Sequence, residues 1–157
     1  MSESRRGRRI LVVSGGQTGV DRAALDAALD LGLPIAGWCP RGRRAEDGPI
    51  HERYPLEETP SSRWSQRTDW NVRDSDATLI CVTGAPSRGT ALTIRKAVAR
   101  GKPHLVLDLR DPEAAVRARE WLDSTRPARL NVAGPRETSA PGIHALARAL
   151  LRDVLSG

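Results

Sequence analysis

The regular alternation of short apolar runs with helical patterns is the feature that most constrains the fold. Runs rich in leucine and β-branched residues, which predict strands, are "RILVVS", "LPIAGW", "ATLICV", "PHLVLDL" and "RLNVA". Between them, helical periodicity predicts helices over residues 18–31, 64–75, 89–100 and 112–125, with a last helix near 141–155. Strands that alternate with helices form a parallel sheet whose two faces are both covered. We therefore predict an α/β fold in one domain: a three-layer α/β/α, Rossmann-like, doubly wound architecture with a mainly parallel sheet.

Length and residue types limit the other features of the chain. It has 157 residues, the length of one domain, and contains no run of 18 or more apolar residues. The first residues lack the apolar stretch of a signal peptide, so we expect a cytoplasmic protein without a membrane partner. Cys39 and Cys81 have no paired spacing, which predicts buried thiols. His51, His104 and His144 have no spacing suited to a shared metal, and no metal site is predicted.

Half of the net positive charge of the chain lies at its start. The formal net charge is +6, and residues 1–9 carry four arginines against one glutamate. We expect these residues to form a disordered basic tail, followed by a Rossmann-like ligand-binding domain over residues 10–157. The other arginines are interspersed with acidic residues, and the chain has no phenylalanine and one tyrosine on which bases could stack. Nucleic acid is therefore not the expected partner, although an interaction module that uses the tail is an alternative.

A glycine-rich turn, "SGGQTG", follows the first predicted strand directly and precedes a helix. Its three glycines allow backbone N–H groups to approach an anion at a helix start. The spacing matches neither GxGxxG nor GxxxxGK[ST], so it indicates an anion without naming a nucleotide. Thr18 and Asp21 also have the spacing of a capping box, which would give Asp21 a purely structural role. Arg22, Asp26 and Asp30 recur every four residues and are expected to form a solvated, salt-bridged face.

Two further turns follow predicted strands in the same way. The turn "TGAPSRGTALT" follows "ATLICV", and "NVAGPRETSAPG" follows the last strand. If "ATLICV" neighbours the first strand, the first turn faces Gly84, Gly89 and Thr90 across a crevice at the carboxyl edge of the sheet. The alternative is that these glycines only permit tight turns.

Polar clusters accompany the glycine turns. Residues 40–63 form a long segment without clear periodicity, which predicts a functional loop. In this segment three arginines precede Glu46 and Asp47, and further along Arg67 and Asn71 lie one helical turn apart. Arginines suit phosphate groups, whereas carboxylates suit the edge of an amino-substituted heterocycle. The alternative is a surface loop with ion pairs. Trp38, Trp64 and Trp70 could line a pocket, although core packing is expected for at least two of them.

Six segments in order resemble the molybdenum cofactor carrier family, relatives of the LOG-like (SLOG) Rossmann-type nucleotide-binding proteins. They are "GGQTGVDRAALDAA", "GWCPRGRRAEDGPI", "YPLEET", "RTDWNVRDSDATLI", "GTALT" and "LNVAGPRE", and the resemblance covers residues 10–155. It implies binding, storage or carriage of molybdenum cofactor (molybdopterin), a phosphorylated pterin that holds molybdate. It further implies a homo-oligomer, a dimer or tetramer, and molybdoenzymes or cofactor-insertion proteins as partners.

The wider relatives also include enzymes that cleave the N-glycosidic bond of nucleoside monophosphates. Their hallmark is a PGGxGTxxE turn, and here the corresponding turn reads "APSRGTALT", with Thr93 in place of the glutamate. A threonine cannot supply the anionic group that an oxocarbenium-like transition state requires, so we expect binding without a catalytic residue. A nucleotide sensor or a nucleoside monophosphate N-glycosidase is the alternative, because Asp21, Glu46 or Asp47 could supply a carboxylate from another wall.

Together with the resemblance, the turns and clusters define a candidate site for a phosphorylated pterin or a nucleotide. "SGGQTG" would be a phosphate-binding loop, "SRGT" would hold the same or a second anionic group, the arginines would neutralise charge, and Glu46, Asp47 and Asn71 would read the heterocycle. Cys39 is an alternative soft ligand for molybdenum. The candidate binding residues are Gly15, Gly16, Gln17, Thr18, Gly19, Asp21, Arg43, Arg44, Glu46, Asp47, Arg67, Asn71, Gly84, Ser87, Gly89, Thr90, Asn131, Gly134 and Arg136.

Overall fold

A five-stranded parallel sheet forms the centre of the protein. The computed structural model describes residues 9–156. The order of the strands is β2-β1-β9-β7-β8, and every neighbouring pair is parallel. The strands are β1 (Leu11–Val13), β2 (Ile35–Ala36), β7 (Ala77–Val82), β8 (His104–Asp108) and β9 (Arg129–Ala133). All six residues of β7 are buried, as expected for a strand that helices cover on both faces.

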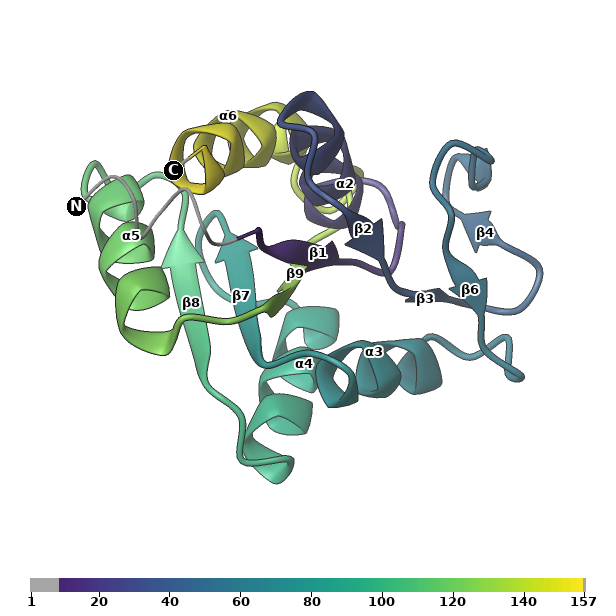
Figure 1. Ribbon diagram of the computed structural model, residues 1–157. Helices are drawn as coiled ribbons and strands as arrows, with labels where there is room; N and C mark the ends of the chain where they lie inside the picture. Colours follow the sequence, from purple (N-terminus) through teal and green to yellow (C-terminus); the bar gives the residue numbers. More distant parts are fainter. Residues whose placement is uncertain (1–8, 157) are drawn as a thin grey trace.

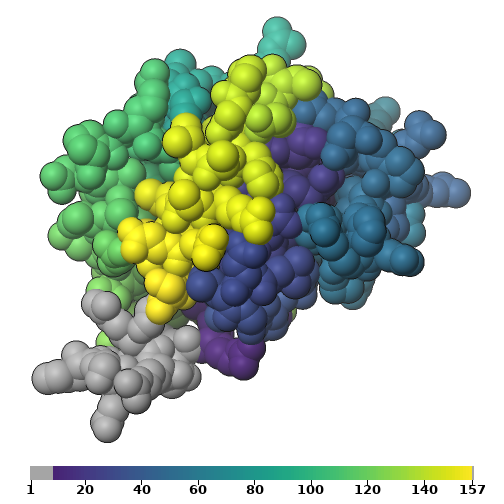
Figure 2. Space-filling view, turned by 90° about the horizontal axis from the view of Figure 1, so that it is seen from above, coloured from purple at the N-terminus to yellow at the C-terminus, as the bar shows by residue number. Residues whose placement is uncertain are grey.

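Helices cover the sheet on both faces, which completes three layers (Figure 1). One face carries α2 (Val20–Asp30), α5 (Ala114–Thr125) and α6 (Ile143–Leu155), and the other carries α3 (Trp64–Arg73) and α4 (Arg88–Ala99). Seen from above, α6 lies between α5 and α2 (Figure 2). The predicted single-domain, doubly wound α/β fold is therefore confirmed.

Small residues let α2 pack closely against its neighbours. Ala23, Ala24, Ala27 and Ala28 are fully buried at positions that follow the helical repeat. Short side chains bring the helix axis near both the sheet and α6, where a buried cluster also contains Leu151. The first glycine turn directly precedes α2, so the packing of α2 holds this turn close to the sheet.

The strand order differs from the arrangement considered from sequence. We considered β7 as the neighbour of β1, but β9 lies between them. The carboxyl ends of β1, β9 and β7 still meet at one edge because all three strands are parallel. The third turn, after β9, is therefore in the middle of that edge and not at its side.

Residues 37–63, which we call the β2–α3 segment, are more ordered than the long loop predicted from sequence. They contain two small two-stranded sheets: β3 (Trp38–Cys39) pairs with β6 (Glu57–Glu58), and β4 (Arg44–Ala45) with β5 (Gly48–Pro49). Cys39, Ile50, Tyr54 and Leu56 bury themselves against Leu25 of α2. This second apolar cluster fixes the segment on the domain.

Arg43 organises the β2–α3 segment from within. Its backbone adopts the left-handed conformation, with a φ of 51°, which is uncommon for a residue other than glycine. Its guanidinium donates to the carbonyl oxygens of Ile50, His51, Tyr54 and Leu56 at 2.9 to 3.3 Å. These charge-assisted hydrogen bonds compensate for the unfavourable backbone conformation.

Three other features of the chain follow from the structure. Both cysteines are free and buried, as predicted, and burial raises the pKa of the Cys81 thiol to about 12. Of the predicted basic tail, residues 1–8 lie outside the described residues, and Arg9 donates a hydrogen bond to the carbonyl oxygen of Gly32. Within residues 9–156, no helix is long and apolar enough to cross a membrane.

Candidate ligand-binding site

A cavity of ≈ 440 Å³ opens at the carboxyl edge of the sheet. Its walls come from the first glycine turn, one face of α3, the N-terminus of α4, and the end of β9 with the turn that follows. The volume lies in the range typical of small-molecule sites. Parallel strands with helices on both faces place such cavities at this edge.

The most deeply buried charges of the cavity are Arg67 and Asp21. Arg67 Nη1 donates to Asp21 Oδ2 at 2.8 Å, and Arg67 is only 8% exposed. Burial raises the pKa of Asp21, and the Arg67 guanidinium opposes that rise. Gly15 makes this arrangement possible, because a Cβ at Gly15 would lie 1.9 Å from Arg67 Nη1.

One donor of this buried arginine has no partner. Arg67 Nε is buried and makes no hydrogen bond with any of the described residues. A buried polar group without a partner is costly, and such groups are few in native proteins. Arg67 also lines the cavity, so its buried guanidinium, with one unpartnered donor, lies beside the space for a bound molecule.

The N-terminus of α4 forms the opposite wall. Ser87 Oγ accepts from Thr90 N at 3.3 Å, and Thr90 Oγ1 accepts from Ser87 N at 3.0 Å, a reciprocal capping box. Within residues 9–156, the N–H groups of Arg88 and Gly89 have no such acceptor. The free N–H groups at this helix start, together with the cationic side chain of Arg88, favour the binding of an anion.

The first glycine turn uses most of its donors internally. Thr18 N donates to Gln17 Oε1 at 3.0 Å, Gly16 N to Ser14 Oγ at 3.3 Å, and the Gln17 backbone to the Asp21 carboxylate. These N–H groups are not free for a phosphate, in contrast to those of α4. The parts of the first turn that line the cavity are Gly15 and Gln17, and within residues 9–156 the N–H group of Gly15 has no acceptor.

The predicted capping box at the start of α2 is wrong. The residue that caps α2 is Gly19, with a φ of 77°, and no side chain caps the helix. The Thr18 hydroxyl instead contacts Glu46 and accepts from Glu137 N at 3.1 Å. The Asp21 side chain therefore does not cap α2, and it pairs with Arg67 instead.

The residues expected to read a heterocycle have protein partners. Asn71 accepts from Trp38 N at 2.8 Å and donates to Trp38 O at 3.0 Å, which ties α3 to β3. Asp47 pairs with Arg22 at 3.0 Å. Glu46 binds the Thr138 hydroxyl at 2.6 Å together with Thr18. All three side chains therefore have hydrogen-bond partners within the protein.

The structure brings eleven of the candidate residues to the cavity and leaves eight outside. Those that line it are Gly15, Gln17, Asp21, Arg67, Asn71, Ser87, Gly89, Thr90, Asn131, Gly134 and Arg136. Those that do not are Gly16, Thr18, Gly19, Arg43, Arg44, Glu46, Asp47 and Gly84. Cys39 does not line it either, and burial raises the pKa of its thiol.

Sequence reasoning missed part of the lining. Arg88 and Thr68 line the cavity, as does Thr93, which the sequence indicated only as a replaced glutamate. Trp64, one of three tryptophans that could line a pocket, also lines it. The signal for α3 was present in the sequence, because positions 64, 67, 68 and 71 share one face of a helix. Among residues 9–156, no group of three or more His, Cys, Asp or Glu side chains could hold a metal ion.

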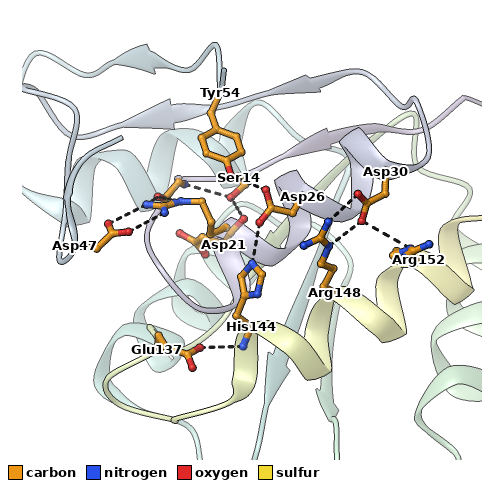
Figure 3. A network of polar contacts seen from close by, with 12 residues as sticks. Ser14, Asp21, Asp26, Asp30, Asp47, Tyr54, Glu137, His144, Arg148 and Arg152 are labelled. Atoms are coloured by element: carbon orange, nitrogen blue, oxygen red, sulfur yellow. Dashed lines mark hydrogen bonds and ion pairs between the residues drawn. The ribbon is translucent and has the colours of Figure 1, made fainter. Parts of the chain in front are cut away.

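A second polar cluster lies between α2, α6 and the β2–α3 segment, and we call it the α2–α6 network (Figure 3). Asp26 accepts from the Tyr54 hydroxyl at 2.5 Å and lies 2.8 Å from His144 Nε2. Asp30 accepts from Arg148 at 2.8 Å. The charges of α2, predicted to form a solvated face, therefore connect this helix to two other elements.

The fold and the cavity together define a class of protein. A doubly wound parallel sheet with a polar cavity at its carboxyl edge, next to a helix start with free N–H groups, is typical of Rossmann-like proteins that bind anionic small molecules.

Comparison with known proteins gives the family. The family model described as "Circularly permutated YpsA SLOG family" matches residues 12–155, and the chain belongs to this family. This confirms the SLOG-type resemblance seen in the sequence. A solved structure from Syntrophus aciditrophicus SB, named "Putative molybdenum carrier protein", is 44% identical and superposes with a TM-score of 0.91. The match covers 94% of this chain and 96% of the other. No curated protein matches the chain.

Proposed function

We propose that the cavity binds molybdenum cofactor, a phosphorylated pterin that carries molybdate, and stores or carries it without catalysis. The observation that carries the proposal is the buried Arg67, whose Nε has no partner although it lines the cavity. The name of the similar protein from Syntrophus aciditrophicus supports a molybdenum-containing cargo. We expect the carrier to be cytoplasmic and to deliver its cargo to molybdoenzymes or cofactor-insertion proteins.

Two donors on opposite walls suit a ligand with anionic groups. On the α3 wall, Arg67 supplies a buried guanidinium whose Nε has no partner among residues 9–156, and α4 supplies the N–H groups of Arg88 and Gly89. A phosphate or molybdate oxygen accepts hydrogen bonds and restores the partner that the buried donor lacks. We therefore assign the anionic part of the ligand to the space between Arg67 and the start of α4.

The cavity wall lacks an obvious nucleophile at the position where related hydrolases have a glutamate. Thr93 stands there, and its hydroxyl donates to the Gly89 carbonyl oxygen at 3.1 Å within α4. A hydroxyl engaged in the helix supplies no negative charge to a developing oxocarbenium ion. This supports carriage over hydrolysis.

One observation favours a second candidate, nucleoside monophosphate cleavage or sensing. Asp21 is a carboxylate that lines the cavity, and burial raises its pKa toward the range useful to a general acid. Its Oδ2 is engaged by Arg67, which limits this role. Release of free base from a nucleoside monophosphate, abolished in Asp21→Asn, would establish the second function and exclude pure carriage.

Native mass spectrometry tests the proposal directly. The protein is incubated anaerobically with molybdenum cofactor, with its metal-free phosphorylated pterin precursor, or with AMP. We expect a stoichiometric cofactor adduct, weakened by about tenfold or more in Arg67→Gln because a charged hydrogen bond is lost. Arg148→Gln is the matched control, since Arg148 pairs with Asp30 away from the cavity. Equal binding by all three proteins, or no adduct at all, would refute the proposal.

Assembly is a separate part of the proposal. The family resemblance implies a homo-oligomer, and we propose a dimer or tetramer. Light scattering coupled to size exclusion measures the mass in solution against the 17.1 kDa of one chain. A mass of one chain at micromolar concentration would exclude the oligomer and leave the cavity proposal intact.

A further inference from the structure

Trp64 differs from the other aromatic residues of the protein. It is the first residue of α3, its side chain lines the cavity, and it is 45% exposed. The other rings have protein partners: Trp38 and Trp70 form an edge-to-face pair at 4.8 Å, Tyr54 is buried, and Trp121 packs on the core. A large indole left open toward a cavity offers a flat apolar surface to a bound molecule.

Arg136 provides a second flat group next to this ring. Its guanidinium carbon lies 5.3 Å from the centre of the Trp64 ring, and both side chains line the cavity. The guanidinium is held only loosely, with Arg136 Nε 3.4 Å from Ser139 Oγ and 3.7 Å from Glu46 Oε2. Arg136 can therefore stay over the indole or move to the far side of a ring that enters between them.

Trp64 and Arg67 occupy successive positions along the cavity-facing side of α3. Trp64 and Arg67 are three residues apart, so they share one face and are separated by about 4.5 Å along the axis. Trp64 is at the exposed end of this face and Arg67 at the buried end. A ligand with a flat ring and an anionic group can contact both side chains at once.

The free surfaces of the cavity favour contact with the face of a ring. The predicted readers of the ring edge, Glu46, Asp47 and Asn71, are occupied by Thr138, Arg22 and Trp38 respectively. The Trp64 ring, in contrast, is contacted by the loosely held Arg136 guanidinium. We infer that Trp64 and Arg136 clamp the flat heterocycle of the ligand by stacking, while Arg67 and the start of α4 hold its anionic end; this rests on the function proposed above.

The clamp sets the specificity of the site. Stacking depends on the flat face of the heterocycle and tolerates different hydrogen-bonding edges. The site therefore accepts phosphorylated pterins and purine nucleoside monophosphates, and it disfavours phosphates that lack a ring. Removal of the indole should weaken the binding of all ligands that contain a flat heterocycle. The binding of anions without such a heterocycle should be unchanged.

Isothermal titration with three probes tests this inference. The probes are cyclic pyranopterin monophosphate, AMP, and ribose 5-phosphate, which carries a phosphate but no flat heterocycle; the proteins are the parent, Trp64→Leu and Trp64→Phe. We expect Trp64→Leu to bind the two ring-bearing probes about tenfold to a hundredfold more weakly. Ribose 5-phosphate should bind equally to all three proteins, and Trp64→Phe should be intermediate. Leu146→Ala, which removes another exposed apolar side chain outside the cavity, is the matched control.

A spectroscopic readout separates stacking from mere packing. Binding of the pterin or AMP should quench tryptophan fluorescence in the parent, and this quenching should be lost in Trp64→Leu. Unchanged affinity of Trp64→Leu for both ring-bearing probes would overturn the clamp and leave the carrier proposal standing. An equal loss for ribose 5-phosphate would also overturn it, because Trp64 would then only support the cavity. Failure of the parent to bind any probe would overturn both proposals.

Discussion

The α2–α6 network and the cavity contain the same types of residue, yet they differ in which groups have partners. In the network, Asp26 and Asp30 each bind side chains from other elements, and Asp26 connects Tyr54 with His144 (Figure 3). In the cavity, Arg67 pairs with Asp21 through one nitrogen and leaves Nε without an acceptor. Residue type alone therefore does not separate a structural cluster from a binding site.

The difference shows how to distinguish the two kinds of site. A cluster that satisfies its own hydrogen bonds gains nothing from a ligand, whereas a buried donor without a partner is stabilised when one binds. Asp47 was a candidate binding residue in the sequence but is already paired with Arg22.

Asp21→Ala should have the largest effect on stability. It leaves the buried Arg67 guanidinium without its counter-ion, and breaking one partner of a buried pair costs about 3 kcal/mol in the free energy of unfolding. Urea denaturation measures the change. Asp30→Ala, which breaks the more exposed pair with Arg148, should cost clearly less. Similar losses of unfolding free energy in both variants would contradict the difference between the cavity and the network.

Gly15→Ala should disturb the cavity without changing any charge. The new Cβ would lie 1.9 Å from Arg67 Nη1, so the guanidinium has to move away from Asp21. Overpacking of this kind costs about 2 kcal/mol, and ligand binding should fall with it. Gly89→Ala adds a Cβ with nothing within 4 Å and should not lower the thermal midpoint. A stable Gly15→Ala protein with the parent's affinity would contradict the assigned role of Arg67.

Tyr54→Phe tests whether the α2–α6 network contributes to stability without contributing to ligand binding. The change removes the hydroxyl that donates to Asp26 and should lower the free energy of unfolding by about 1 kcal/mol. Asp26 retains His144 as a partner. Because Tyr54 does not line the cavity, affinity for the ligand should be unchanged at temperatures where the variant is folded. A selective loss of binding would mean that the network and the cavity are coupled.

The pH dependence of stability should give the smallest effect. Asp74, at the end of α3 remote from Trp64, accepts from Arg73 and from Trp38 Nε1, which lowers its pKa from 3.8 to about 2. A lowered pKa stabilises the folded state above pH 3.8, and this contribution is lost as the pH falls toward 2. Asp74→Asn should therefore flatten the decline in unfolding free energy between pH 4 and about 2. An identical decline in parent and variant would show that Asp74 is not responsible.

Local patterns predicted the fold, whereas strand order depended on distant contacts. The run "ATLICV" became β7, and the helices lie where the 3.6-residue repeat placed them. The position of β9 between β1 and β7 could not be read from the sequence, because pairing over more than 50 residues has no local signature. The strands of the β2–α3 segment are two residues each, too short for any periodicity to appear.

The candidate site was predicted at the level of its turns more than of its individual side chains. Ser87, Gly89 and Gly134 line the cavity, since turns after parallel strands must meet at one edge. Asn71 lines it too, but its amide pairs with the backbone of Trp38, 33 residues away in the sequence. Thr18 had the spacing of a capping residue, yet the positive φ of Gly19 turns the chain before the helix starts. Such partners depend on tertiary contacts that no spacing rule contains.

The central place of β9 has a consequence for the synthesis of the protein. Residues 129–133 join β1 and β2 to β7 and β8, so the two halves of the sheet have no shared hydrogen bonds until this late strand is added. A chain emerging from the ribosome exposes the apolar edges of both halves until most of it has been made. The cavity itself is thereby confined to finished chains, because β9 and its following turn form one of its walls.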